Sequence, residues 1–246
     1  MGFIAGIQYN IRGVALALKT PSLLMLGLIR FAVVLLLALV LSGMVLYWHN
    51  DIFSMIWQMP ESRWLIWLWH IVSWILTFTL MAFSMLISYL ISQIFFCVFI
   101  MDYMSRITER MVLGQEAPGA HTSIFGLFLY LILQEIPRAV VPVLISVTLM
   151  IIGLFTPVSL VIIGLSAVVA GIFLAWDNTD LVPARRMVPF RERFAFLRKN
   201  LFFHIGFGLL FLVPWLNILF LSFAPVGATL YYIEKERKKH GLGFDL

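Results

Sequence analysis

The feature that most restricts the fold of this chain is an uninterrupted apolar run from Trp64 to Met101. It contains no Pro or Gly, and as a helix it would be about 57 Å long, nearly twice the roughly 30 Å thickness of a bilayer core. The polar segment that follows is compatible with a helix as far as Gly114, a residue type that often caps helix ends. We predict one very long helix over residues 62–113 that crosses a membrane and extends beyond it. Two shorter helices are the alternative.

The composition indicates an integral membrane protein. Apolar residues occupy 62% of the 246 positions and charged residues only 12%, whereas soluble domains are about 45–50% apolar. The first twenty residues lack the compact basic start and the continuous apolar core of a cleavable signal peptide. The single cysteine, Cys97, rules out an internal disulfide and a cysteine-based metal site.

The apolar segments together predict an all-α integral membrane protein, with two long transmembrane helices, two partially inserted helical hairpins and amphipathic surface helices in one domain over residues 1–246. Residues 3–18 carry apolar side chains at helical spacing, which is typical of a helix on the membrane surface. Residues 21–48 are long enough for one span. Residues 185–199 indicate a basic amphipathic surface segment, and a solvated loop explains them equally well.

Two apolar blocks, residues 122–176 and 201–233, are each interrupted by proline. Proline favours the start of a new helix, so each block is predicted to form a helical hairpin. The first arm of the second hairpin, Phe202–Val213, would reach only about 18 Å, which is too short to cross the membrane. We therefore expect hairpin tips that stop inside the bilayer. The residues assigned to the hairpin turns are Pro157, Pro214, Pro225 and Gly227.

The distribution of basic residues predicts the orientation in the membrane. If the first span and the long helix are the true crossings, nearly all of the 17 Lys and Arg residues lie on the same side as the two chain termini. The positive-inside rule then places both termini in the cytoplasm.

Sequence motifs of common enzymes are missing: there is no GxSxG, HExxH, P-loop or CxxC pair. The chain is therefore not expected to be an enzyme, and neither a cofactor, a metal ion nor a nucleic acid is expected as a partner. Ionisable and polar residues inside the apolar segments are better candidates for function, because they are costly in lipid and often mark a transport pathway.

Three such residues are notable. Arg30 would lie about 14 Å along the first span, where it either binds an anion or extends toward the lipid headgroups. Arg138 follows Pro137 between two apolar arms, three residues after Glu135, with which an ion pair is the simpler explanation. Asn217 lies at an uncharged hairpin tip, where it could cap the returning helix, or where free N–H groups could hold a small oxyanion.

The long helix also carries a row of hydroxyl residues on one face. Small hydroxyl side chains let membrane helices pack closely, and this explanation is favoured over a pore lining. The residues are Ser73, Thr77, Ser84, Ser88 and Ser92.

A recognisable pattern of Asp, Pro, Gly and Asn residues occupies the C-terminal third. It comprises Asp180, Pro189-Phe190, Gly206, Gly208, Pro214 with Asn217, and a closing group of Pro225, Gly227, Ala228 and Thr229. This pattern resembles the signature of the CysZ family of bacterial sulfate permeases, which are related to the etoposide-induced membrane proteins of eukaryotes. The resemblance implies two long spans and two partially inserted hairpins, assembled as a homo-oligomer that admits sulfate to the cell for cysteine synthesis.

A second part of the resemblance lies in the first span. The family tends to carry Gly-Leu-Arg-Arg-Phe there, a motif linked to sulfate binding, and this chain has Gly27, Leu28, Ile29, Arg30 and Phe31. The resemblance therefore assigns Gly27, Leu28 and Arg30 to an anion site. With Ile29 in place of one arginine, a divalent oxyanion loses a charged donor.

These observations predict a permease or channel for sulfate or a similar oxyanion in the bacterial inner membrane, feeding sulfur assimilation. Arg30 would attract or bind the anion, Asn217 and the backbone at the tip would orient it, and Arg138 would help to hold the hairpin geometry. The alternative is a membrane protein that does not transport but shapes lipid or scaffolds partners. The N-terminal surface helix and the basic segment suit that role.

Overall fold

The computed structural model describes residues 2–58, 60–114, 124–156, 159–213 and 216–239, and all regular secondary structure in these ranges is helical. The chain forms two compact units: unit 1 contains Met1–Phe31 and Ile94–Leu246, and unit 2 contains Ala32–Gln93. By length and composition, four described helices could cross a membrane. They are α2 (Pro21–Tyr47), α4 continued into α5 (Arg63–Leu113), α7 (Ser159–Thr179) and most of α11 (Leu216–Lys239). The prediction of two full crossings with two partly inserted hairpins stays a prediction.

The long helix predicted for residues 62–113 is continuous. α4 (Arg63–Ser92) passes through the π-helical segment Gln93–Cys97 into α5 (Val98–Leu113), and Gly114 ends it in the left-handed conformation, with φ of 74°. The π segment contains one extra residue per turn. One row of buried positions accordingly steps by four residues before it, by five across it and by four after it: Ser88, Ser92, Cys97, Met101.

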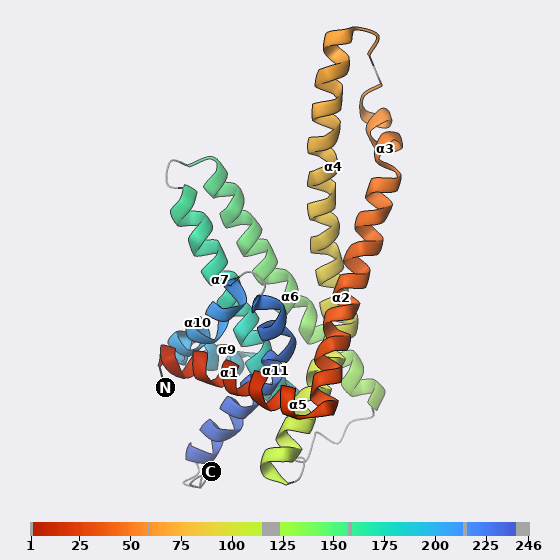
Figure 1. The fold of residues 1–246 in the computed structure, drawn as a ribbon. Helices are drawn as coiled ribbons and strands as arrows, with labels where there is room; N and C mark the ends of the chain where they lie inside the picture. Colours follow the sequence, from red (N-terminus) through yellow and green to blue (C-terminus); the bar gives the residue numbers. More distant parts are fainter. Residues whose placement is uncertain (1, 59, 115–123, 157–158, 214–215, 240–246) are drawn as a thin grey trace. The chain divides into compact units, whose positions relative to one another are not determined.

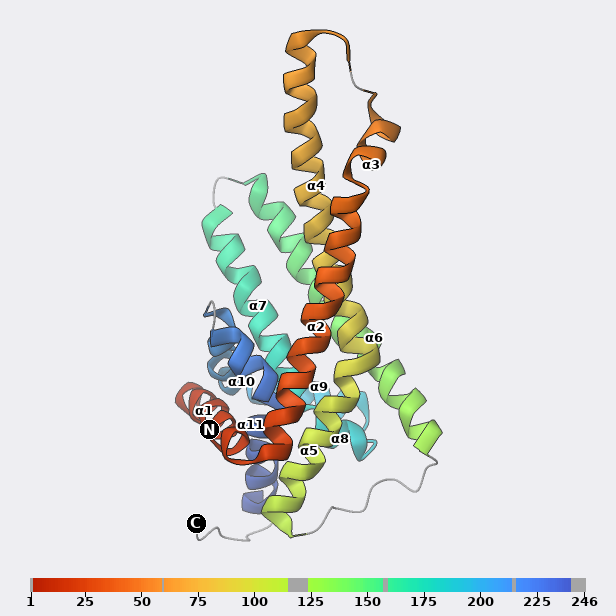
Figure 2. The same ribbon diagram turned by 45° about the vertical axis from the view of Figure 1, so that its right-hand side comes forward.

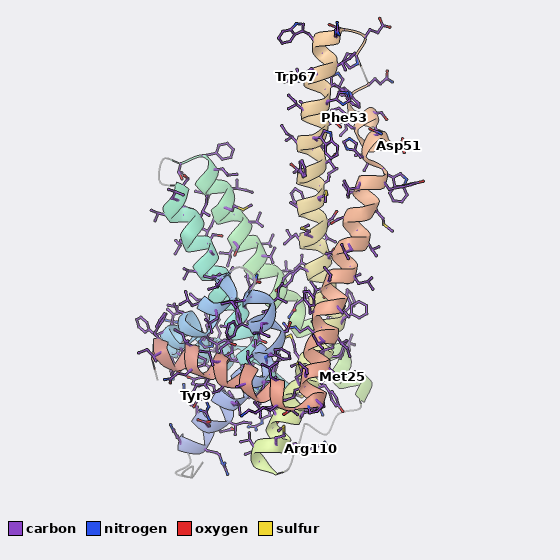
Figure 3. All side chains as sticks on the ribbon, viewed as in Figure 1. Tyr9, Met25, Asp51, Phe53, Trp67 and Arg110 are labelled. Carbon is purple, nitrogen blue, oxygen red and sulfur yellow. The ribbon has the colours of Figure 1, made fainter. Side chains whose placement is uncertain are left out.

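Unit 2 is held together by aromatic packing between α4 and the short helix α3 (His49–Ile56), which carries Phe53 (Figure 3). The ring of Phe53 packs edge-to-face against Trp69 of α4, with the ring centroids 4.9 Å apart. The indole Nε1 of Trp69 donates to the backbone oxygen of Trp57, 2.9 Å away. Edge-to-face aromatic pairs stabilise beyond simple area burial, so these contacts fix α3 against α4.

In unit 1, α1 (Phe3–Lys19) lies across α10 (Leu201–Leu209) and α11 (Figure 1). The helices approach backbone to backbone through glycines: a Cβ at Gly6 would lie 2.2 Å from Phe203 O, and one at Gly13 would lie 2.3 Å from Gly227 N. The small-residue face is therefore turned inward. Most of the apolar stripe predicted to lie on the membrane surface is turned outward, with Ile4, Ile11 and Leu18 exposed, but Val14 of the same stripe is buried in the core.

The first predicted hairpin is formed by α6 (Ile124–Leu154) and α7, which run antiparallel and side by side (Figure 2). The hydroxyl of Ser166 on α7 donates to the backbone oxygen of Ser146 on α6, 2.9 Å away. The connecting Pro157 lies outside the described residues.

The second predicted hairpin follows α8 (Leu181–Arg185) and α9 (Phe190–Lys199). The chain bends by 76° between α9 and the arm Leu201–Leu212, which comprises α10 and the 3₁₀ turn Leu210–Leu212. The return arm is α11. Pro214, assigned to the turn, lies outside the described residues.

The assignment of Pro225 and Gly227 to a turn is wrong, because both residues lie inside α11. Gly227 is needed for close packing rather than for a turn, since a Cβ there would lie 2.4 Å from the backbone oxygen of Tyr9 on α1. Pro225 is tolerated in the helix because a side chain from another helix replaces the hydrogen bond that proline removes, as described below.

Candidate functional site

Arg30 lies on α2 and contacts α11 at its proline. The Nη1 atom of Arg30 donates to the backbone oxygen of Leu221, 2.6 Å away. In a regular α-helix this oxygen would accept from the amide of the residue four positions later, which here is Pro225, a residue without an N–H group. Arg30 therefore satisfies the carbonyl that the proline leaves open.

The guanidinium of Arg30 retains further hydrogen-bonding capacity. Arg30 is only 4% exposed, and a guanidinium carries five N–H donors. Among the described residues, its one hydrogen bond is to Leu221 O, and no carboxylate forms an ion pair with it. A buried cation that has only a neutral partner is costly, and an anion would be an effective complement.

The other residues of the predicted motif have different environments. Gly27 packs directly on α11, because a Cβ at this position would lie 2.1 Å from the ring of Phe223. Its role in the structure is to let α2 approach α11 closely enough for Arg30 to reach Leu221. Leu28 is 56% exposed and has no polar side-chain atom to offer.

Asn217 lies in the first turn of α11 and is partly buried, and its backbone N–H donates to Val213 O, 3.0 Å away. It precedes Leu221 by one turn, or about 6 Å along the helix axis. The fold thus places Asn217 and the residue bonded by Arg30 on neighbouring turns of one helix. Arg138 lies in α6, and its side chain is outside the described residues.

Sequence reasoning missed a buried ionic network in unit 1. Arg185 on α8 reaches two carboxylates of α5: Nη1 lies 2.7 Å from Asp102 Oδ1, and Nη2 bonds Glu109. Arg186 bonds the other oxygen of Glu109 at 2.7 Å and Glu236 of α11 at 2.6 Å. The network joins α5, α8 and α11 through charge-assisted, largely buried hydrogen bonds.

Hydroxyl groups and a tight turn complete this network. Ser105 of α5 accepts from Thr229 at 2.9 Å and from Arg185 at 3.4 Å. Met187, which follows the two arginines, has a φ of 54°, an uncommon conformation for a long side chain that turns the chain toward α9. Burial alone would lower the pKa of Arg186, but its hydrogen bonds to Glu109 and Glu236 outweigh that effect and raise the pKa.

A second buried pair lies beside the network. Arg193 of α9 bonds Asp180 through Nη1, and both side chains are 1% exposed. The description of residues 185–199 as a basic surface segment is therefore wrong for Arg185 and Arg193, because carboxylates elsewhere in the chain neutralise them. One feature of the sequence could have indicated the network. Asp102 and Glu109 are two turns apart and share a helix face, so both carboxylates can meet one partner segment.

Unit 2 has its own polar cluster, which involves part of the predicted hydroxyl row. Nε2 of His49 lies 3.1 Å from the hydroxyl of Ser73, and Nδ1 bonds Thr77. Other hydroxyls bond the carbonyls of their own helix, as Ser88 does to Ser84 O at 2.6 Å. Within the described residues, the row is therefore used at least in part for helix structure and packing.

A comparison with protein families found one relevant match. A family model described as "Sulfate transporter CysZ/Etoposide-induced protein 2.4" matches residues 9–222. The matched segment includes Arg30, the long helix, the buried pairs of α8 and α9, and Asn217. No curated protein sequence matches the chain. In the described part of the chain, no group of three or more His, Cys, Asp or Glu residues could hold a metal ion.

Proposed function

Because the chain belongs to the sulfate transporter CysZ/etoposide-induced protein 2.4 family, we propose that it conducts an inorganic oxyanion, sulfate in the first place, across the bacterial inner membrane. The family is one of membrane transport proteins, and the several apolar helices of this chain suit a multi-pass membrane protein. Transport through such a protein feeds sulfur assimilation. The proposed conduction involves no enzymatic step.

The observation that supports an anion is the buried guanidinium of Arg30. It lies on a candidate membrane helix and donates one hydrogen bond to Leu221 O. No carboxylate of the described residues forms an ion pair with it. The remaining donors suit the oxygens of sulfate, which bind guanidinium groups through charge-assisted hydrogen bonds. Asn217, which lies one turn before Leu221 on α11, would orient the anion, and Arg138 would support the hairpin.

The proposed topology rests on the distribution of basic residues and on the lengths of the apolar segments. Both termini lie in the cytoplasm, α2 and the long helix cross the membrane, and the two hairpins enter it part of the way. The short arm Leu201–Leu212 supports partial insertion of the second hairpin, since its length of about 18 Å does not span the core. The active form is a homo-oligomer embedded in lipid.

The second candidate function is a membrane protein that shapes lipid or scaffolds partners without transporting. The outward-facing apolar stripe of α1, which includes Ile4, Ile11 and Leu18, favours it, because such a helix inserts into one leaflet.

The test is sulfate uptake into liposomes that contain the purified protein, compared with empty liposomes. Arg30→Gln keeps a donor for Leu221 O but removes the charge, while Arg30→Lys keeps the charge. Lys19→Gln, at an exposed position at the end of α1, controls for the loss of a cation. We expect the wild type, Arg30→Lys and Lys19→Gln to carry sulfate, and Arg30→Gln to lose most of the flux.

Wild-type flux in a folded Arg30→Gln protein would refute the role of Arg30. Absence of flux in the inserted wild type, together with deformation of the liposomes, would favour the second candidate function.

A further inference from the structure

Two adjoining cavities lie between α7 and α9 in unit 1. The first, of about 330 Å³, is lined on α7 by Val169, Ile172 and Phe173 and on α9 by Phe194 and Arg198. The second, of about 230 Å³, extends toward α6 and shares Phe173 and Phe194 with the first. We call the combined space the α7–α9 groove.

The walls of the α7–α9 groove are apolar and aromatic. Phe190 and Phe194 stack with their ring centroids 6.3 Å apart and an interplanar angle of 12°, and each ring packs edge-on against Trp176. Phe190 and Phe194 nevertheless remain exposed. An aromatic wall that is well ordered by its own contacts, yet left open, can accept an apolar chain without rearrangement.

One end of the groove carries a cation that no carboxylate of the described residues neutralises. Arg198 is the only charged residue among the described residues that line the two cavities. Arg185, Arg186 and Arg193 are held by carboxylates, whereas no carboxylate of the described residues pairs with exposed Arg198. The groove therefore combines an apolar channel with a guanidinium at its rim that the described part of the chain leaves unneutralised.

We propose that the α7–α9 groove binds an anionic phospholipid, with an acyl chain along Phe173 and Phe194 and the phosphate on Arg198. Charge complementarity selects the anion, and burial of methylene groups against the aromatic wall holds the chain. Two further exposed cations of α9, Arg191 and Lys199, lie on the same helix and strengthen the attraction of an anionic leaflet. The proposal does not depend on sulfate transport.

Native mass spectrometry of the full-length protein in detergent tests this directly. The probes are dioleoylphosphatidylglycerol, which is anionic, and dioleoylphosphatidylcholine, which has no net charge. The matched variants are Arg198→Ala, at the rim of the groove, and Arg191→Ala, on the same helix but outside the groove lining. A third variant, Val169→Trp, fills the groove.

We expect the wild type to retain phosphatidylglycerol in preference to phosphatidylcholine. Arg198→Ala should weaken retention of phosphatidylglycerol about fivefold, as expected for the loss of one basic group near an anionic headgroup, and Arg191→Ala should change it by less than about twofold. Val169→Trp should reduce the retention of both lipids.

Equal losses in the two arginine variants would indicate diffuse surface charge and overturn the proposal. So would equal retention of the two lipids by the wild type. The same spectra report the oligomeric state, so an oligomer lost in Val169→Trp with unchanged lipid adducts would identify the groove as an interface between copies of the chain instead.

Discussion

The Nη1 atom of Arg30 lies 2.6 Å from the backbone oxygen of Leu221, on the very carbonyl that Pro225 leaves without a helical donor. Arg30 thus has a structural role in α11 in addition to the anion-binding role proposed for it. Truncation to alanine would remove both, so the two roles must be separated by other substitutions.

The structural role of Arg30 predicts an energetic coupling with Pro225. Arg30→Ala leaves the partly buried oxygen of Leu221 without a donor, which should lower the free energy of unfolding by about 1–3 kcal/mol. In a Pro225→Ala background, the restored N–H group of residue 225 donates to this oxygen. Arg30→Ala should therefore lower the free energy of unfolding by less in that background. Unfolding of the four proteins of this double-mutant cycle in mixed detergent micelles measures the difference. Equal costs in the two backgrounds would show that the contact is not stabilising.

The neighbouring residue offers a gain-of-function prediction. Ile29 is exposed. It occupies the position of the first arginine in the Gly-Leu-Arg-Arg-Phe motif that the CysZ family tends to carry. Ile29→Arg should add a charged donor beside Arg30 and raise the affinity for sulfate about tenfold, equivalent to ~1.4 kcal/mol.

The measurement for Ile29→Arg is the concentration dependence of sulfate uptake into liposomes, with Ile29→Gln as an uncharged control of similar length. Enhanced uptake by both variants alike would point to an effect of polarity rather than charge.

The buried ionic network predicts unequal costs for two substitutions on α5. Glu109 is almost fully buried and pairs with Arg185 and Arg186. Glu109→Gln removes the carboxylate that these two guanidinium groups share, leaving each with one carboxylate partner, Asp102 or Glu236, and should destabilise the fold by about 3 kcal/mol or more. Arg106 is 30% exposed and pairs with Asp102 one turn away. Arg106→Gln should therefore lower the free energy of unfolding by less than about 1 kcal/mol. Thermal unfolding of purified protein compares the two. Similar losses of stability would mean that the network is not preferentially stabilising.

Partial insertion of the first hairpin predicts that its tip is closed to aqueous reagents. Phe155, beside that tip, is 84% exposed in the protein alone. In Phe155→Cys, a membrane-impermeant maleimide should label the cysteine from neither side of sealed vesicles. The native Cys97 is fully buried and should not react.

Met55→Cys provides the positive control for this experiment, because Met55 is 86% exposed between the two proposed crossings. It should be labelled from the side opposite to the termini. Labelling of Phe155→Cys from that same side would show that the hairpin crosses the membrane and would contradict partial insertion.

The sequence was sufficient to predict the helical class, the continuous long helix and its end at Gly114, because apolar run length and helix-breaking residues are local properties. It was insufficient for Pro225, which a distant guanidinium makes compatible with a helix. Arg185 and Arg193 were misjudged for the same reason: their neutralising partners, Glu109 and Asp180 among them, are supplied by tertiary contacts. Composition reveals that charges exist, but not which of them meet.

The π segment Gln93–Cys97 allows the long helix to differ in length by one residue at this place. Buried Ser92 and Cys97 are five residues apart, so the π segment takes up one extra residue without changing the buried face. Deleting one residue from this segment, and thereby restoring a regular helix, would place the same two positions four residues apart and keep Asp102 and Glu109 on their present face. A deletion elsewhere in the helix would instead rotate the following residues by about 100°. Homologues that keep the ionic network should therefore have either the present number of residues between Ser92 and Asp102 with a π segment, or one residue fewer with a regular helix.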